Sequence, residues 1–221
     1  MKAMILAAGR GERMRPLTDS NPKPLLEAGG KPLVVWVIEA LARARFAELV
    51  INVSHLGSRI ERALGDGRRW NVRISYSHEP EALETAGGIA KALPLLGAVP
   101  FAVVNGDIHT DFDFSRLAAP REGAAAHLVL VDNPPHHPAG DFALECGRVA
   151  NEGEALYTFS GIGVYHPALF SHIRAGTKCQ LASVLRPRIA AGLVTGEHYR
   201  GRWQDIGTPE RLAALDGALR S

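Results

Sequence analysis

Short apolar runs alternate with longer stretches of helical period over the first 132 residues, and this alternation constrains the fold more than any other feature. Five apolar runs predict strands, at 3–8, 48–54, 72–77, 100–107 and 126–132. Three segments between them predict helices, at 32–46, 56–67 and 85–97. Because strands that alternate with helices form parallel βαβ units, we expect an α/β fold.

The pattern changes after Asp132. Residues 133–141 are rich in turn formers, and residues 142–167 read as short strands joined by polar loops, which predicts a mixed or antiparallel extension. The last segment, 208–221, predicts a helix with Thr208 as its N-cap and Pro209 in its first turn. A chain of 221 residues is long enough for one sizeable core, and we expect a single domain over residues 1–221.

Charge and cysteine content argue against several classes of protein. The 25 Lys and Arg residues are scattered among 23 Asp and Glu residues, without the basic stripe of a nucleic-acid-binding protein. The apolar start is too short to cross a bilayer, so we expect no contact with a membrane. Cys146 and Cys179 lie far apart without metal-ligand spacing, which fits a reducing compartment, and we expect a cytoplasmic protein.

The loop after the first predicted strand, LAAGRGERMRPLT at 6–18, is glycine-rich and cationic. Glycines let the backbone approach a ligand closely, and exposed N–H groups in such a turn bind phosphate oxygens. Two familiar phosphate motifs do not fit, because Met14 stands where the dinucleotide fingerprint needs glycine and the Gly-Lys-Ser/Thr of the P-loop does not occur. Alone, the loop predicts either a phosphate-binding turn or an ordinary turn with solvated arginines.

Four segments extend this pattern over nearly the whole chain. They are the opening loop with PKPLL at 22–26, HEPEALETAGGIAKAL at 78–93, VVNGDI at 103–108 and RWQDIGTP at 202–209. In this order they resemble the signature of the sugar-1-phosphate nucleotidyltransferases, enzymes that join a nucleotide to a sugar phosphate. The resemblance implies a three-layer Rossmann-like nucleotidyltransferase fold with a mixed, mainly parallel central sheet and a small antiparallel extension.

The resemblance also implies which residues act in catalysis. Asp107 follows an apolar run, at the carboxyl end of a predicted parallel strand, where open α/β sheets bind ligands. With Asp205 it is expected to hold Mg²⁺, which binds one or two carboxylates together with phosphate oxygens. The expected catalytic residues are Arg13 on the leaving pyrophosphate, Lys23 near the reacting phosphates, Asp107 and Asp205.

The substrate-binding residues are likewise expected from the resemblance. For the nucleotide they are Ala8, Gly9, Gly11, Glu12, Arg13, Lys23, Glu79, Pro80 and Gly87. For the sugar they are Asn105, Gly140, Asp141, Asn151, Glu152, Glu154, Gly161 and Arg202. Without the other segments, Gly87 would be read only as part of a helix start.

Two positions depart from the family pattern. Glu12 stands where threonine or serine is usual, and its carboxylate is expected to point away from the triphosphate. The usual Glu-Lys-Pro segment, whose lysine holds the sugar phosphate, is not recognisable between Val149 and Phe159. Another cation, Arg202 or Lys23, is expected to take the place of that lysine.

Within the family, the compact form with a short hairpin is similar to members that transfer a uridylyl group from UTP to N-acetylmuramic acid α-1-phosphate in peptidoglycan recycling. Two alternatives remain open inside the family: mannose-1-phosphate guanylyltransferases, and glucose-1-phosphate uridylyl- or thymidylyltransferases. A phosphocholine cytidylyltransferase is a further enzymatic alternative, and a nucleotide-sugar-binding regulatory subunit is the non-enzymatic one. We expect small-molecule substrates only, and a monomer that forms a minimal catalytic core.

Overall fold

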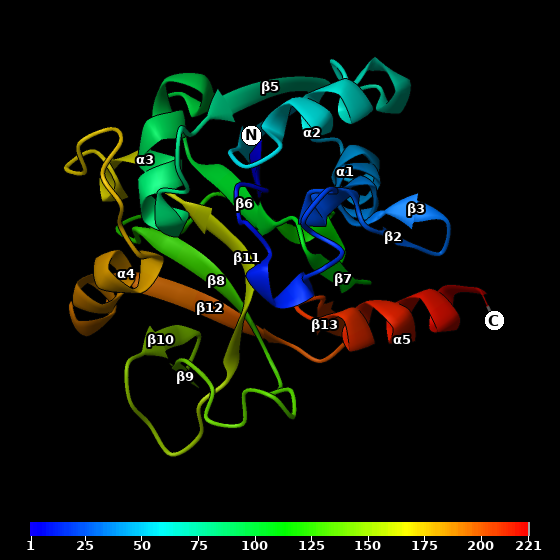
Figure 1. Cartoon of the computed structure of the whole chain (residues 1–221). Coiled ribbons are helices and arrows are strands. Elements are labelled where there is room, and N and C mark those ends of the chain that lie inside the picture. Colours follow the sequence, from blue (N-terminus) through cyan, green and yellow to red (C-terminus); the bar gives the residue numbers. More distant parts are fainter. Residues whose placement is uncertain (221) are drawn as a thin grey trace.

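The computed structural model describes residues 1–220 and shows a central sheet between two layers of helices (Figure 1). Within these residues nine strands form the sheet: β1 Ala3–Leu6, β4 Glu48–Val53, β5 Arg73–His78, β6 Phe101–Asn105, β8 Ala126–Val131, β9 Ala143–Glu145, β10 Arg148–Ala150, β11 Thr158–Tyr165 and β12 Val194–Tyr199. Two antiparallel ribbons stand outside it, β2 Glu27–Ala28 with β3 Lys31–Pro32, and β7 Ile108–Thr110 with β13 Trp203–Asp205. The α-helices are α1 Leu33–Arg43, α2 Gly57–Leu64, α3 Glu84–Leu96, α4 Leu181–Ala190 and α5 Pro209–Arg220.

The sheet is mixed and mainly parallel, as predicted. Its strand order is β5-β4-β1-β6-β11-β8-β12-β10-β9. β5, β4, β1 and β6 pair in parallel, β12 is parallel to β8, and β11 is antiparallel to both β6 and β8. β9 and β10 form an antiparallel hairpin at the edge, which is part of the predicted extension, whereas β11, from the same predicted segment, lies inside the central sheet between β6 and β8. The carboxyl ends of the four parallel strands therefore meet at one edge of the sheet.

Alternation of side chains across the sheet builds a core on each face. Ala3 and Ile5 of β1 pack with residues of α1 and α2, whereas Met4 packs on the opposite face with residues of α3 and α4. Both faces are buried, which explains why these strands read as continuous apolar runs in the sequence. Within residues 1–220, no helix is both long and apolar enough to cross a bilayer.

Several predicted elements are shorter than expected because local conformation or a side chain interrupts them. β1 ends at Leu6 instead of residue 8, since the N–H of Ala7 donates to Oδ1 of Asn52 at 2.8 Å. α1 ends at Arg43 instead of residue 46, close to Arg45 in the left-handed region with φ 65°. The N-cap of α5 is confirmed, since Oγ1 of Thr208 accepts from the N–H of Arg211 at 3.4 Å.

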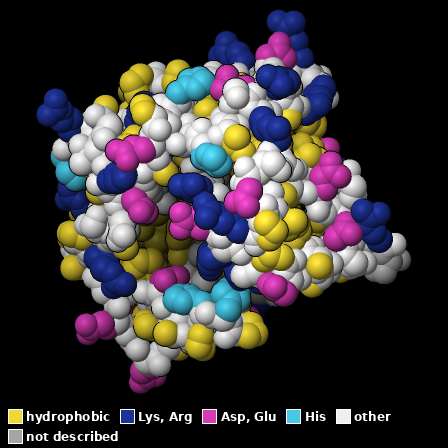
Figure 2. Space-filling view, in the orientation of Figure 1, with side chains coloured by type: hydrophobic (Ala, Val, Ile, Leu, Met, Phe, Trp, Pro, Cys, Tyr) yellow, Lys and Arg dark blue, Asp and Glu magenta, His cyan; other side chains and the backbone are white. Residues whose placement is uncertain are grey.

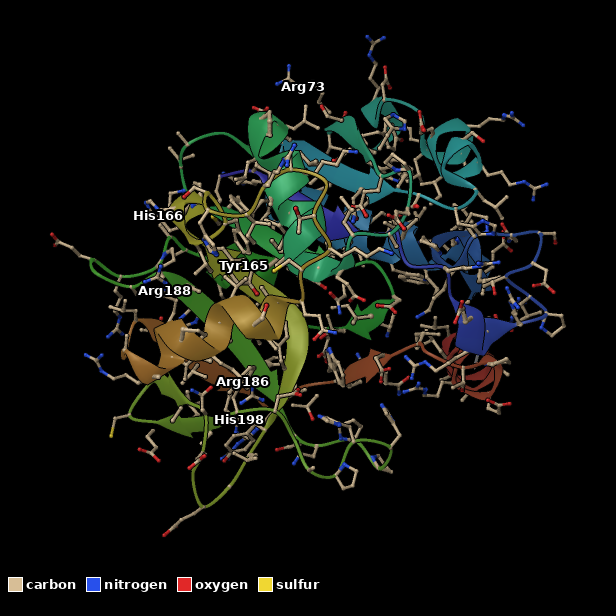
Figure 3. The ribbon with its side chains drawn as sticks, turned by 60° about the vertical axis from the view of Figure 1, so that its left-hand side comes forward. Arg73, Tyr165, His166, Arg186, Arg188 and His198 are labelled. Atoms are coloured by element: carbon tan, nitrogen blue, oxygen red, sulfur yellow. The ribbon has the colours of Figure 1, made fainter. Side chains whose placement is uncertain are left out.

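α4 and β12 are elements that the sequence pattern does not predict. α4 has no capping side chain and contains Pro187, both of which weaken the signal of a helix. β12 contains Gly196 but pairs with β8 over six residues, so tertiary pairing outweighs its weak strand propensity. Figure 3 shows α4, which carries Arg186 and Arg188, packed over this side of the sheet.

Candidate active site

The carboxyl edge of the parallel strands holds a cavity of about 320 Å³. Leu6 of β1 lies in register between Asn52 of β4 and Asn105 of β6, and the cavity opens beyond these three residues and reaches the first turn of α3. Figure 2 shows a hollow near the centre of the face in view, with charged side chains of both signs beside it. Six predicted site residues line the cavity: Ala8, Gly9, Lys23, Glu79, Asn105 and Asp107.

The turn after β1 presents backbone donors without partners. The N–H groups of Gly9, Arg10 and Gly11 donate to no group among residues 1–220. A side chain on Gly9 would point into open space, so the bare backbone of Gly9 is accessible from the cavity. Gly11 adopts φ 67°, and its carbonyl accepts from Oγ1 of Thr18 at 2.8 Å, which fixes the shape of the turn. Free N–H groups arranged in this way suit an anion.

Lys23 and Asp107 form an ion pair that lines the cavity next to this turn. Lys23 begins a short 3₁₀ helix, Lys23–Leu25, and its side chain is only 11% exposed. Asp107 follows β6, with its side chain 32% exposed, and its Oδ2 contacts Nζ of Lys23. A buried ammonium needs a partner of opposite charge, so each group holds the other in place.

The β7–β13 ribbon brings Asp205 next to Asp107. Asp205 pairs with Ile108 across the ribbon, and the N–H of Ile206 donates to the carbonyl of Asp107 at 2.8 Å. Nη1 of Arg211, on α5, donates to both carboxylate oxygens of Asp205, at 2.7 and 2.8 Å. Nε2 of His136 lies 2.8 Å from Oδ1 of the same carboxylate. The pairing of β7 with β13, each only three residues long, thus brings together two aspartates that lie nearly 100 positions apart in the sequence.

Arg13 and Glu12 follow the glycine turn in the short 3₁₀ helix Glu12–Met14. Both side chains are exposed. A Cβ atom built on Gly207 would lie 3.2 Å from Nη2 of Arg13, so the Arg13 guanidinium reaches the backbone two residues after Asp205.

Glu79 is buried and held by hydrogen bonds. Oε1 accepts from Nδ2 of Asn52 at 2.7 Å, and Oε2 accepts from the N–H of Leu83 at 2.9 Å. A Cβ atom on Gly88 would lie 2.7 Å from Oε1 of Glu79, so the close approach of α3 requires a glycine there. Asn52 therefore links the ends of β1 and β4 to the carboxylate that lines the cavity.

We expect Asn52→Ala to lower the free energy of unfolding by about 1–3 kcal/mol, because the buried Glu79 carboxylate and the N–H of Ala7 lose their partner. Urea unfolding monitored by circular dichroism measures this loss. Asn21→Ala is a matched control, since the Asn21 amide makes only a long 3.4 Å hydrogen bond to Leu25 and its removal should cost less than ~0.5 kcal/mol. Equal stabilities of the two variants would contradict the role assigned to Asn52.

Three of the residues predicted for the sugar lie on the β11 side of Asp107. Gly161 adopts φ 78° in an irregular part of β11, and a side chain there would overlap the amide of Asn105. Oδ2 of Asp141 accepts from the N–H of Phe159 on the same strand at 2.8 Å. Gly140, with φ 67°, packs closely on the backbone of Leu156.

Pro80 and Gly87 lie outside the cavity lining. Pro80 is exposed beyond Glu79. A side chain on Gly87 would overlap the carbonyl oxygen of Thr177, and the N–H of Gly87 donates to the carbonyl of Cys179 at 3.1 Å. The local role of Gly87 is therefore close packing of α3 against residues 177–179.

Arg202 stands at the opposite end of the β7–β13 ribbon from Asp205. Its side chain is 86% exposed, and its Nε donates to Oδ2 of Asp111 at 3.1 Å. A hydrogen bond from Tyr199, followed by those from Arg202, lowers the pKa of Asp111, so this ion pair persists at neutral pH. The structure thus does not bring Arg202 to the aspartate pair.

Asn151, Glu152 and Glu154 belong to the segment after β10. The amide of Asn151 donates to the carbonyl of Arg186 on α4 at 3.0 Å, whereas Glu152 and Glu154 are exposed. These three side chains do not line the cavity.

Sequence reasoning missed Asn52, His136 and Arg211 as members of the site. Asn52 had a usable signal, since it is a polar residue inside an apolar strand run, and buried polar groups require partners. His136 belongs to the turn-rich segment 133–141, and only the structure shows its contact with Asp205. Arg211 has no distinguishing signal, because an arginine in the first turn of a helix is ordinary in sequence.

Asp107 and Asp205 suit a hard divalent cation by their chemistry. Both offer carboxylate oxygens, and their backbones are joined by the hydrogen bond from Ile206. Among residues 1–220, no cluster of three or more His, Cys, Asp or Glu side chains could hold a metal by itself. A divalent ion would therefore take its remaining ligands from substrate phosphates and water, as Mg²⁺ commonly does.

Comparisons with known proteins show the family of this chain. The model of the nucleotidyl transferase family matches residues 2–220. The N-acetylmuramate α-1-phosphate uridylyltransferase of Neisseria meningitidis serogroup B is 54% identical over 100% of both chains. The mannose-1-phosphate guanyltransferase β-B of Xenopus laevis is 32% identical over 95% of this chain, which spans 62% of that longer protein.

The fold has solved counterparts as well. A putative glucose-1-phosphate thymidylyltransferase from Bacillus anthracis, solved in complex with a sucrose, superposes with a TM-score of 0.87 at 20% identity and covers 100% of this chain and 96% of that one. That likeness supports the three-layer fold with its mixed sheet. The match of the family model over nearly the whole length shows that this chain belongs to the nucleotidyl transferase family.

Proposed function

We propose that the protein transfers a uridylyl group from UTP to N-acetylmuramic acid α-1-phosphate and releases pyrophosphate. The observation that carries the proposal is the 54% identity with the Neisseria meningitidis uridylyltransferase over the full length of both chains. In this reaction a phosphate oxygen of the sugar phosphate attacks the α-phosphorus of UTP, and the bond from that phosphorus to the bridging oxygen of the pyrophosphate breaks.

The cavity supports recognition of a base with an N–H flanked by a carbonyl. The Glu79 carboxylate lines the cavity and can accept from a ring N–H. The backbone N–H groups of Glu84 and Thr85, at the first turn of α3, have no partner among residues 1–220 and can donate to a base carbonyl. Uracil, thymine and guanine present this pattern, whereas cytosine and adenine lack the ring N–H. The pattern therefore disfavours a cytidylyltransferase.

The cations around Asp107 support phosphoryl chemistry between two anions. The free N–H groups at residues 9–11 would hold the phosphates of UTP, and Lys23 would neutralise the phosphate at the reacting centre. Members of the family generally use a divalent metal ion. We assign Mg²⁺ to Asp107 and Asp205, where it would offset the negative charge of the phosphates when bound.

The sugar would occupy the side of the cavity near Asn105 and Asp141. We propose that the short β9–β10 hairpin, whose strands have three residues each, leaves space for the bulky lactyl ether of the muramic acid. We propose a monomer as the active form. We place the reaction in the cytoplasm, where UTP is available, within peptidoglycan recycling.

Pyrophosphate release with each nucleoside triphosphate against a panel of sugar 1-phosphates tests the proposal. We expect the highest kcat/KM for UTP with N-acetylmuramic acid α-1-phosphate. N-acetylglucosamine 1-phosphate lacks the lactyl carboxylate, so its kcat/KM should be about 10- to 100-fold lower. A higher kcat/KM with GTP and mannose 1-phosphate would contradict the proposed substrates and indicate a guanylyltransferase. Tight nucleotide binding without turnover on any pair would indicate a regulatory subunit instead.

A further inference from the structure

Gly207 lies between two guanidinium groups that come from distant parts of the sequence. A Cβ atom built on Gly207 would overlap Nη2 of Arg211 and lie 3.2 Å from Nη2 of Arg13. Gly207 is buried, and its φ lies outside the left-handed region, so its backbone conformation does not require glycine. The missing side chain leaves the space in which both guanidinium groups approach the same Cα atom, and a side chain there would make the Arg211 guanidinium shift.

The hydrogen bonds of these arginines leave donors unused. Arg211 directs Nη1 to Asp205 and to the ring of His136, while its Nη2 has no acceptor among residues 1–220. Arg13 makes no hydrogen bond or ion pair within the same residues. Asp205 offsets one of the two positive charges, and the second charge remains without a protein partner. Two guanidinium groups held close together in this way favour an anion between them.

We propose that Arg211 is a further binding residue for the reaction, and that with Arg13 it holds the pyrophosphate part of the nucleoside triphosphate before and after cleavage. This inference rests on the proposed nucleotidyl transfer. The Gly9–Gly11 turn, whose N–H groups are free, lines the cavity at Gly9 and ends two residues before Arg13, so a phosphate chain bound along this turn would extend toward the arginine pair. Lys23 is paired with Asp107 at the reacting centre. The arginine pair is therefore available for the β- and γ-phosphates of the nucleoside triphosphate.

The chemistry of arginine fits this ligand. A guanidinium presents several N–H donors in a planar fork, and two of these forks can contact several oxygens of a pyrophosphate at once. The Asp205 carboxylate beside Arg211 would repel a bare anion, so we expect pyrophosphate to bind in the presence of a divalent cation.

Titration calorimetry with inorganic pyrophosphate and Mg²⁺ on the full chain tests the inference. Arg211→Met should raise the Kd of pyrophosphate by about 10- to 100-fold, because charge-assisted hydrogen bonds are lost. Gly207→Ala removes no charge, but its methyl group displaces Nη2 of Arg211, and we expect a rise of about tenfold. Arg211→Lys keeps a cation beside Asp205 without the planar fork, and its Kd should lie between those of the wild type and Arg211→Met.

Arg220→Met is the matched control on the same helix. Arg220 is exposed and pairs with Asp216 at the far end of α5, so its loss should leave the Kd of pyrophosphate unchanged. In steady-state kinetics, Arg211→Met should raise the inhibition constant of pyrophosphate and the KM of UTP, while the KM of the sugar 1-phosphate stays within about twofold.

An unchanged Kd of pyrophosphate in both Arg211→Met and Gly207→Ala overturns the inference. A raised KM for the sugar 1-phosphate with unchanged pyrophosphate affinity also overturns it, and assigns Arg211 to the sugar phosphate instead. If Arg211→Met does not fold, Gly207→Ala and Arg211→Lys decide the question. Failure of the proposed function is a separate result, namely no turnover by the wild type on any substrate pair, whereas the calorimetric comparison does not depend on turnover.

Discussion

Asp107→Asn is expected to lower kcat by about 10³-fold, which corresponds to ~4 kcal/mol of lost transition-state stabilisation. The substitution keeps the shape of the side chain but removes its charge. A neutral amide binds a divalent cation far more weakly than a carboxylate, and it also leaves the Lys23 ammonium without its counter-ion. Pyrophosphate release at saturating Mg²⁺ and substrate measures the effect.

Two further variants make this expectation specific. Asp205→Asn should show a loss of similar size, since both aspartates are assigned to the same metal. Asp113→Asn is the control, because Asp113 is exposed and caps a short 3₁₀ helix through Ser115. Urea unfolding should show that all three variants fold. Activity of Asp107→Asn within about tenfold of the wild type would remove Asp107 from the catalytic site.

Lys23→Met is the second substitution for which we expect a large effect, with kcat/KM lowered by about 10²- to 10³-fold. The Lys23 side chain is 11% exposed and ends at the Asp107 carboxylate, so its positive charge acts in a site partly shielded from water. Methionine keeps the length and the apolar stem while removing that charge. Steady-state kinetics with UTP and the sugar 1-phosphate measures the loss.

Lys31→Met provides the control for this change. Lys31 forms a comparable ion pair with Glu39 at 2.6 Å, but it lies on the β2–β3 ribbon outside the cavity lining, and its removal should leave kcat/KM unchanged. Because Lys23 and Asp107 act as a pair, the double variant Lys23→Met with Asp107→Asn should be much less impaired than the product of the two single losses. Independent, multiplicative losses would show that the two residues do not act together.

The sequence alone predicted most of the parallel half of the fold. Residues 3–6 and 101–104 are apolar on both faces of the sheet, and such continuous runs are a local signal of buried parallel strands. The cap at Thr208 was also readable, because the hydrogen bond of an N-cap joins residues only three positions apart. The same pattern placed Asp107 and the glycine turn each after the end of a predicted parallel strand.

Tertiary structure decided how the rest of the site comes together. Asp205 meets Asp107 through strands of three residues, too short for a periodic signal, whose pairing joins positions nearly 100 residues apart. Arg211 and Arg13 converge beside Gly207, which leaves room between them, and Gly87, which the family resemblance implied for the base, packs against residues 177–179. Local patterns report which face of an element is buried, whereas the partner of a charged side chain depends on how distant segments pair and on the space between them.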